Sequence, residues 1–162
     1  MKGVALSSCL LRGNRAMEII DLSQTECWNF VGGGRLGRLG CAKDNLPYIV
    51  PLSLAAESGR LYAFTTLGRK VEYLRSNALV CVQFDEIKSP QEWTSIVVQG
   101  RCEEITDDAA QEHAFQLLQR RPVWWEPGYV RTAVKGNLRN EVPLYFCVIA
   151  EDISGRRGIA GN

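Results

Sequence analysis

Two hydroxyls, a glycine and two cations stand together in residues 65–70, which read Thr-Thr-Leu-Gly-Arg-Lys. The preceding residues are typical of a β-strand and the following ones have helical spacing, so we expect a strand, a turn and a helix. Lys and Arg are unfavourable at a helix N-terminus, where the helix dipole is positive. A bound anion would offset that cost by accepting from the free N–H groups, the hydroxyls and both cations. The pattern favours a phosphate site.

The same pattern has a plainer interpretation. A strand, a turn and a helix with solvated basic side chains would carry these residues without binding any ligand, because Arg-Lys pairs are common on protein surfaces. Gly68 fits either interpretation, since a residue without Cβ allows a tight turn and also lets the backbone approach a ligand. Charge pattern alone leaves both open.

Cysteine and histidine offer little further chemistry. Six cysteines are present and none forms a C-x-x-C pair, which argues against a zinc ribbon or a thioredoxin-like motif. Cys41, Cys81, Cys102 and Cys147 fall in strand-like apolar runs, so we expect buried free thiols. His113 is the single histidine, and its helical surroundings predict a partly exposed side chain. We expect no metal site.

The composition is that of one soluble domain. The chain has 162 residues, of which 46% are hydrophobic and 23% charged, and 19 basic residues nearly balance 18 acidic ones. This balance argues against nucleic-acid binding through overall charge. No apolar run reaches the roughly 20 residues of a membrane span. Residues 1–16 lack the order of a secretory signal, so we expect a flexible extension and a cytoplasmic protein.

Closely spaced strands predict an antiparallel meander rather than βαβ units. Ser23 and Glu26 form a capping box that starts a helix, and Pro51 marks an edge strand or a bulge. We expect a polar loop at 87–92, irregular structure at 122–141 and a basic tail at 153–157. The expected strands are 37–41, 48–56, 61–65, 79–84, 93–105 and 144–149, and the expected helices are 23–32, 69–76 and 107–119. This content is typical of a small closed or partly open barrel.

Several segments resemble the pyridoxamine 5′-phosphate oxidase superfamily. Residues 61–70, followed by Leu74 and Asn77, are similar to its flavin phosphate segment. Its neighbouring strands resemble residues 34–39, 47–52 and 95–101, in matching order. The closing residues 153–157 resemble the end of the branch that includes nitroimidazole-resistance proteins. The likeness divides the chain into an N-terminal extension at 1–16, an FMN-binding split-barrel domain at 17–157 and a C-terminal tail at 158–162.

The resemblance implies a mainly β fold, an antiparallel six-stranded split β-barrel of Greek-key type with two or three flanking helices. It also implies a homodimer with FMN at the subunit interface. Thr65, Arg69 and Lys70 would hold the phosphate, and residues 50–53 would run along the isoalloxazine edge. The implied cofactor-binding residues are Val50, Pro51, Leu52, Ser53, Phe64, Thr65, Thr66, Arg69, Lys70, Ser95, Trp124 and Trp125.

Some of these assignments have plainer alternatives. Ser95 would place a polar side chain near the ring, or it is an exposed strand residue. One of Trp124 and Trp125 would border the flavin from the partner chain, or the two form a hydrophobic lid. Arg131, Lys135 and Arg139 could face an anionic substrate, although solvated loop cations are the simpler interpretation.

The implied function is that of an FMN-dependent oxidoreductase acting on a small molecule. No side chain stands out as a catalytic acid or base. True pyridoxamine phosphate oxidases carry a C-terminal Arg-x-His-type pattern, and no histidine follows His113, so we do not expect this substrate. The alternatives are a haem-binding split barrel, a deazaflavin-dependent reductase and a non-catalytic flavin-binding module.

Overall fold

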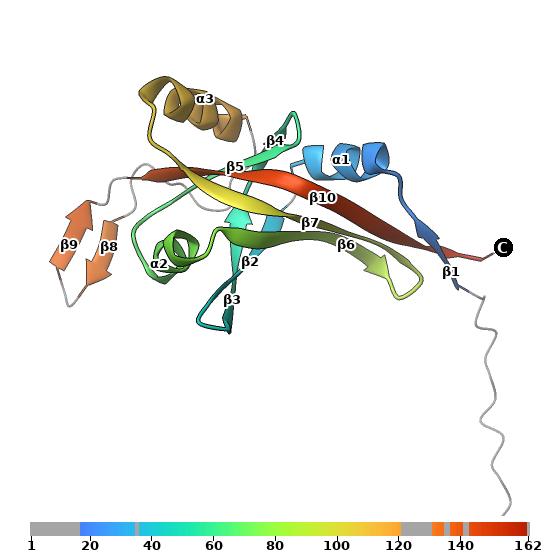
Figure 1. Cartoon of the computed structure of the whole chain (residues 1–162). Coiled ribbons are helices and arrows are strands. Elements are labelled where there is room, and N and C mark those ends of the chain that lie inside the picture. Colours follow the sequence, from blue (N-terminus) through green and yellow to red (C-terminus); the bar gives the residue numbers. More distant parts are fainter. Residues whose placement is uncertain (1–16, 35, 121–130, 135–136, 141–142, 162) are drawn as a thin grey trace, which may run out of the picture.

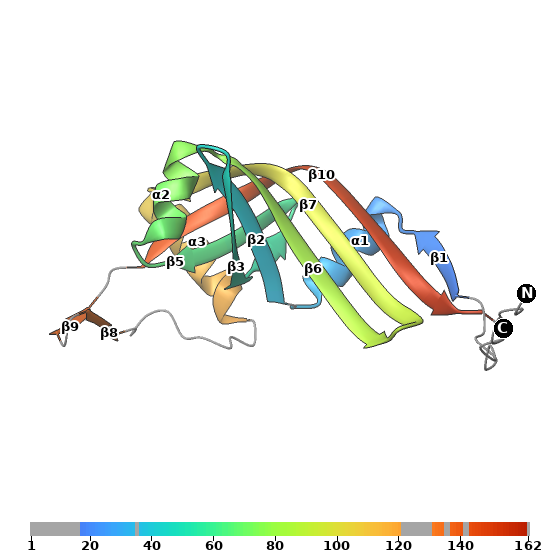
Figure 2. The same ribbon diagram turned by 90° about the horizontal axis from the view of Figure 1, so that it is seen from below.

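One antiparallel sheet of eight strands forms the body of the molecule, with three helices around it (Figures 1 and 2). The computed structural model describes residues 17–34, 36–120, 131–134, 137–140 and 143–161. Its strands are β1 (Met17–Asp21), β2 (Leu36–Lys43), β3 (Leu46–Ser53), β4 (Ala55–Glu57), β5 (Arg60–Thr65), β6 (Leu79–Ser89), β7 (Glu92–Ile105), β8 (Arg131–Val134), β9 (Asn137–Asn140) and β10 (Leu144–Ala160). Its helices are α1 (Gln24–Gly32), α2 (Arg69–Ser76) and α3 (Asp108–Gln119).

The order of the strands explains where the barrel is split. The path is β3-β2-β6-β7-β10-β5-β4, and β1 pairs with the end of β10. The two edge strands, β3 and β4, follow each other in the chain and are separated by Leu54 alone, whose side chain is buried. The sheet therefore curls until its two edges meet at one residue without pairing. The expected mainly β, antiparallel split-barrel fold is confirmed, with eight strands in its sheet rather than six.

The core follows from period-two alternation along the central strands. On β2, Gly37, Leu39 and Cys41 are buried while the residues between them are more exposed. The same alternation runs along β6 and β7, as expected for Ile96 and Val98. The largest fully buried side chains are Phe84, Leu39, Leu61, Ile96, Val82, Val98, Val148 and Cys27.

Helix α1 begins where the sequence predicts. The Ser23 hydroxyl accepts from the backbone N–H of Glu26, and the Glu26 carboxylate accepts from the Ser23 backbone N–H at 2.9 Å. This capping box satisfies two backbone donors that would otherwise lack partners. Cys27 and Val31 are the buried residues of the helix, which packs against β10 and β4. Helices α2 and α3 also lie within one residue of their expected bounds.

The ends of three strands and β1 form an extension of the sheet that the sequence did not predict. We call it the wing: β1 and residues 85–89, 92–96 and 155–160 of β6, β7 and β10. The expected loop at 87–92 is a tight turn at 90–91, and the expected tail at 153–157 is strand, because β10 stays paired with β7 through Gly158. These predictions were wrong because the wing is polar and its pairing is non-local.

Three further expectations need correction. The predicted strand 48–56 is two strands, because the chain turns at Leu54. The segment predicted to be irregular, 122–141, contains the β8–β9 hairpin. Cys81 is exposed, since it lies on the outer face of β6 opposite Gly40, whereas Cys41, Cys102 and Cys147 are buried as expected. In the part of the chain that is described, no helix is long and apolar enough to cross a membrane.

Gly100 is required by the close packing of β7 against β10. A Cβ at this position would lie 2.0 Å from the carbonyl oxygen of Ile149, next to the register shift between Ala150 and Asp152. Backbone cannot move aside as a flexible side chain can, so Gly100→Ala should lower the free energy of unfolding by about 2–4 kcal/mol. Urea denaturation measures this.

Gly32→Ala is the matched control, because a Cβ there meets no heavy atom within 4 Å. It should change stability by less than about 1 kcal/mol. Equal effects of the two substitutions would contradict this account of the β7–β10 packing.

Candidate cofactor-binding site

The turn between β5 and α2 leaves the start of the helix uncapped. Gly68 occupies the N-cap position, and no side chain there accepts a hydrogen bond from the first turn. The Thr65 hydroxyl, 4% exposed, donates to the Thr66 carbonyl at 3.1 Å. The first N–H groups of α2 therefore lack a side-chain partner and carry the positive end of the helix dipole. Such a terminus can receive an anion.

Lys70 is a half-buried cation without a counter-ion. Among the described residues, no hydrogen bond or ion pair reaches its ammonium group, and it lies near the Cys41 thiol. Burial lowers the pKa of Lys70 to about 8, from an ordinary 10.5. Removing a charge from water without a partner is costly. The structure therefore holds at this site a charge that an anionic ligand would stabilise.

Arg69 is exposed and lies over an aromatic ring. Its guanidinium carbon is 5.8 Å from the centroid of the Tyr48 ring, a cation–π geometry. The Tyr48 ring is in turn 5.4 Å from that of Tyr73, centroid to centroid. Because Tyr48 belongs to β3 and Tyr73 to α2, this contact joins the edge strand to the helix. Sequence reasoning did not single out either tyrosine, since only the tertiary contact reveals their role.

The basic side chains around the site differ from Arg69 and Lys70 in being neutralised. Lys43 pairs with Glu72, and the guanidinium of Arg75 makes two hydrogen bonds to Glu104, of 3.0 and 2.9 Å. Arg38 pairs with Asp85 across β2 and β6. In the described structure, Arg69 and Lys70 are not paired with a carboxylate, so the positive potential concentrates at the start of α2.

The edge strand β3 brings the other predicted residues alongside. Val50, Pro51, Leu52 and Ser53 lie on its second half, beyond Tyr48, and Leu52 is buried. Pro51 stands on an edge strand as predicted, since β3 pairs with β2 alone in the described sheet. Half of the backbone polar groups of an edge strand face away from its partner. They are available to the polar atoms of a ligand.

Two predicted residues point elsewhere. The Phe64 side chain is buried with Ala55 and Leu118 beneath α3, so this residue could offer a ligand only its backbone. Thr65 lines a cavity of about 270 Å³ between α2 and the start of β10, together with Cys102 and Arg75. Burial raises the pKa of the Cys102 thiol to about 12, which leaves no thiolate there at neutral pH. Thr66, half-buried, lies between these two environments.

Ser95 lies far from the start of α2 in the same protomer. The register places Ile105 of β7 beside Tyr145, which pairs with Phe64 at the end of β5. Ser95 is ten positions back along β7, roughly 33 Å of extended strand. One protomer therefore does not bring Ser95 to the candidate phosphate site.

The remaining predicted residues give little further information. Trp124, Trp125 and Lys135 lie outside the described residues, as do the side chains of Arg131 and Arg139. His113 is exposed as expected, and its Nε2 lies 2.6 Å from the Glu57 carboxylate. No group of three or more His, Cys, Asp or Glu side chains in the described ranges could hold a metal ion.

Comparison with known proteins identifies the family. The family model described as pyridoxamine 5′-phosphate oxidase matches residues 23–157. An uncharacterised protein of Rhizobium meliloti is 38% identical over 145 residues, which cover 87% of this chain and 96% of that protein. The chain therefore belongs to the pyridoxamine 5′-phosphate oxidase family, as its motifs indicate.

Solved structures agree with this assignment. The structure of a FAD-binding protein from Mesorhizobium loti is 36% identical, with a TM-score of 0.71, over 88% of this chain and 98% of that one. A proposed 5-nitroimidazole antibiotic resistance protein from Bacteroides thetaiotaomicron has a TM-score of 0.67 at 20% identity, over 88% and 89% of the two chains. The second likeness shows the shared fold.

Replacing Lys70 by an apolar side chain should stabilise the ligand-free protein. Lys70→Met removes an unpaired, half-buried charge and keeps most of the side-chain volume. The free energy of unfolding at pH 7 should rise by about 1–3 kcal/mol, measured by urea denaturation. Lys43→Met is the control, because Lys43 is paired with Glu72, and it should lower stability by less than about 1 kcal/mol. A destabilised Lys70→Met protein would contradict this picture.

The same charge predicts a pH dependence. Because the pKa of Lys70 is about 8 in the folded protein and ordinary in the unfolded chain, the unfolded state holds more protons between pH 8 and 10.5. Stability of the ligand-free protein should therefore rise with pH across that window. Other groups titrate there too, so the measurement is the difference between the wild-type and Lys70→Met unfolding free energies at each pH. A constant difference would refute the prediction.

Proposed function

We propose that this chain is a cytoplasmic, FMN-binding flavoprotein that acts as an oxidoreductase on a small molecule. The observation that carries the proposal is the uncompensated Lys70 charge at the uncapped start of α2. The FAD-binding relative at 36% identity supports a flavin. A reducing compartment is supported by the free state of all five described cysteines.

The charge of the site favours FMN over FAD. The phosphate of FMN is a monoester that carries up to two negative charges at neutral pH, whereas each phosphate of FAD is a diester with one. Two unpaired cations, Arg69 and Lys70, match the monoester. The backbone of residues 50–53 would then meet the polar edge of the ring, since β3 leads away from Tyr48 and α2. These residues fit the cofactor.

When bound, the flavin would supply the electron-transfer chemistry, and the protein would bind and orient it. Arg69 and Lys70 would hold the phosphate, while Tyr48 and Tyr73 keep β3 and α2 in register. We do not propose pyridoxamine phosphate as the substrate, because the chain has no histidine after His113. A haem protein is disfavoured, since the His113 ring nitrogen is bonded to Glu57. A deazaflavin reductase and a non-catalytic flavin module remain the alternatives.

A homodimer would complete the site. Ser95 is too far from α2 within one protomer, so a role at the ring requires the Ser95 of a second copy. The outer face of the sheet carries large apolar side chains that are exposed in the protomer, including Ile49, Leu79 and Ile87. A shallow hollow of about 670 Å³ lies between Ile49 and Leu79 on this face. Exposed apolar surface of this kind favours burial against a partner.

The absorption spectrum of the purified protein tests cofactor binding, and mass spectrometry of the released ligand separates FMN, FAD and deazaflavin. Lys70→Met should weaken FMN binding by about 10- to 150-fold, the equivalent of a charge-assisted contact of about 1.5–3 kcal/mol. Lys43→Met should leave the affinity unchanged. A colourless wild-type protein that gains no flavin on titration would end the proposal.

Mixed dimers test whether two copies build one site. Ser95→Tyr and Lys70→Met proteins should each fail to bind FMN on their own. When co-refolded, each heterodimer should regain one intact site, formed by the Lys70 of one protomer and the Ser95 of its partner. If mixing restores no flavin absorbance although heterodimers form, both residues act within one protomer or Ser95 plays no part.

A further inference from the structure

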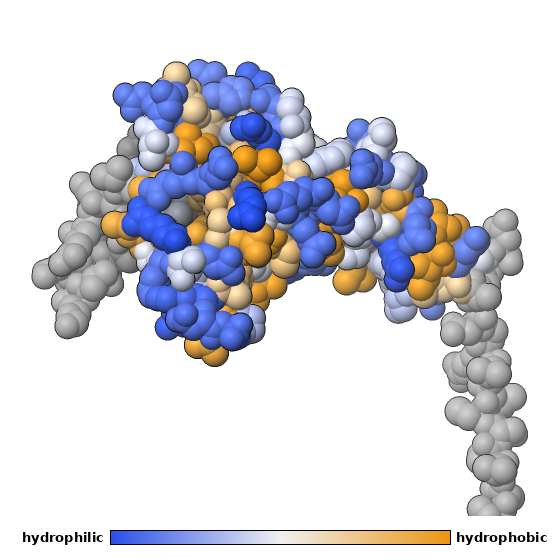
Figure 3. All heavy atoms as spheres, in the orientation of Figure 1, coloured by the Kyte–Doolittle hydropathy of each residue, from blue (hydrophilic) through white to orange (hydrophobic). Residues whose placement is uncertain are grey.

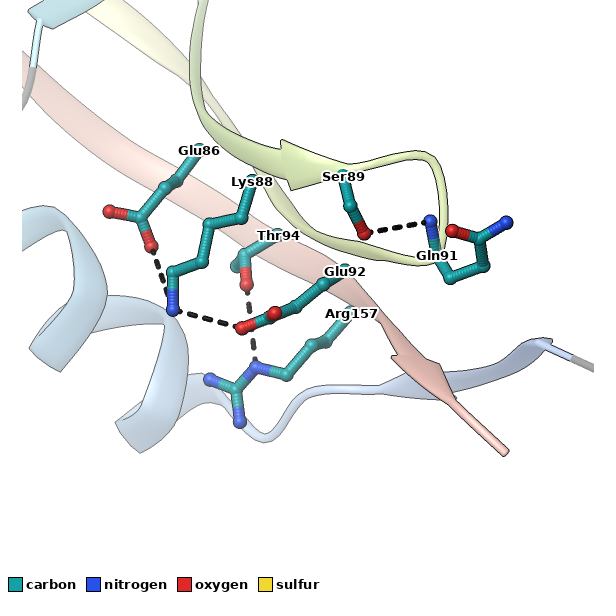
Figure 4. A network of polar contacts seen from close by, with 7 residues as sticks. All are labelled: Glu86, Lys88, Ser89, Gln91, Glu92, Thr94 and Arg157. Carbon is teal, nitrogen blue, oxygen red and sulfur yellow. Dashed lines mark hydrogen bonds and ion pairs between the residues drawn. The ribbon is translucent and has the colours of Figure 1, made fainter. Parts of the chain in front are cut away.

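A polar pocket lies on the wing, on the face that bears α1. Its volume is about 360 Å³, at the small end of ligand pockets. Its lining includes Phe30 of α1, Glu86 and Lys88 of β6, Glu92 and Thr94 of β7, and Arg157 of β10. Figure 4 shows most of these side chains converging from three strands.

This pocket is separate from the candidate flavin site. Thr94 and Ser95 are neighbours on β7, so their side chains point to opposite faces of the sheet. The pocket opens on the Thr94 face, whereas Ser95 shares the outer face with Asp85 and Arg156. The wing is also the end of the sheet away from α2 (Figure 2).

Two adjacent arginines have different partners here. Arg156 points to the outer face and pairs with Asp21 of β1 at 3.1 Å. The Arg157 Nε donates to the hydroxyl of Thr94 at 3.3 Å, and Thr94 is only 7% exposed. In the described structure, no hydrogen bond or ion pair reaches the two terminal nitrogens of Arg157. They point away from Thr94 towards α1 (Figure 4).

The carboxylates around Arg157 are bound to other groups. Lys88 lies 3.0 Å from Glu92 and 4.0 Å from Glu86. Glu26, whose charge also acts on Arg157, accepts from the backbone and hydroxyl of Ser23 at 2.9 and 2.7 Å, and these bonds lower its pKa. The Arg157 fork is therefore fixed at Nε and keeps two parallel donors for another acceptor.

We propose that this pocket binds a small carboxylate, held by the two terminal nitrogens of Arg157. A planar guanidinium fork matches a carboxylate through two parallel hydrogen bonds, which a single neutral acceptor cannot make. The buried Thr94 hydroxyl sets the orientation of the fork. Phe30 and Trp93, which also lines the pocket, supply apolar surface for the body of the ligand. An aromatic or short-chain carboxylate is the class that fits.

Exposed apolar residues elsewhere on the wing do not cover this pocket. Figure 3 shows apolar atoms over β1 and its surroundings, where Met17 and Ile19 are exposed. Ile19 pairs with Gly158, which lies one position beyond Arg157 and faces the outer side with Trp93 and Ile87. The apolar row and the polar pocket therefore lie on opposite faces, and the pocket stays accessible if a partner covers the row.

Titration of the full-length purified protein with benzoate tests the proposal, followed by ligand-observed NMR and calorimetry. Benzoate should bind, and benzamide, its uncharged analogue, should bind at least tenfold more weakly. Arg157→Gln should weaken benzoate binding at least tenfold, whereas Arg156→Gln should leave it unchanged because that side chain faces the other way. Thr94→Val should weaken binding severalfold, since it removes the group that orients the fork.

Three results would overturn the proposal: no benzoate binding, equal binding of benzoate and benzamide, or equal effects of the two arginine substitutions. If Arg157→Gln fails to fold, Arg157→Lys takes its place, and it should also weaken binding because a point charge lacks the fork. Lys70→Met protein should keep its benzoate affinity. Loss of benzoate binding in that variant would place the carboxylate at the flavin site instead.

Discussion

The positive charge of Lys70, withdrawn from water without a counter-ion, is the constraint on which this account of the molecule depends. A fold that needed only stability would place an apolar side chain there or pair the ammonium, as it does for Lys43 and Arg75. The short β5–α2 turn, the uncapped helix and the Tyr48–Tyr73 contact all hold this charge in place. Each of these features has a physical purpose if an anionic cofactor belongs there.

The split in the barrel supplies the rest of the site. Because β3 and β4 meet at Leu54 without pairing, β3 keeps an open edge beside the cations, where a closed barrel would have none. The long strands β6, β7 and β10 carry Ser95 far from that edge and continue into the wing. The sheet thus separates a phosphate-binding end from a polar end, and a two-fold arrangement of copies would bring the two together.

Local chemistry was predictable from the sequence, and non-local pairing was not. The capping box at Ser23, the helix after Gly68 and the buried face of β7 each depend on neighbouring residues, and their predictions were confirmed. The strand Met17–Asp21 has no alternation of burial and exists because it pairs with residues 156–160. The contact of Arg69 with Tyr48 and the different partners of Arg156 and Arg157 likewise depend on strands far apart in the chain.

Proton uptake on flavin binding is the most direct test of the central claim. At pH 9 the Lys70 side chain of the ligand-free protein should be largely neutral, since its pKa is about 8, and a phosphate dianion should return its proton. Calorimetry in two buffers of different ionisation enthalpy should show that FMN binding takes up close to one proton, while riboflavin, which lacks the phosphate, takes up none. Equal proton uptake for the two ligands, or none for FMN, would contradict the account.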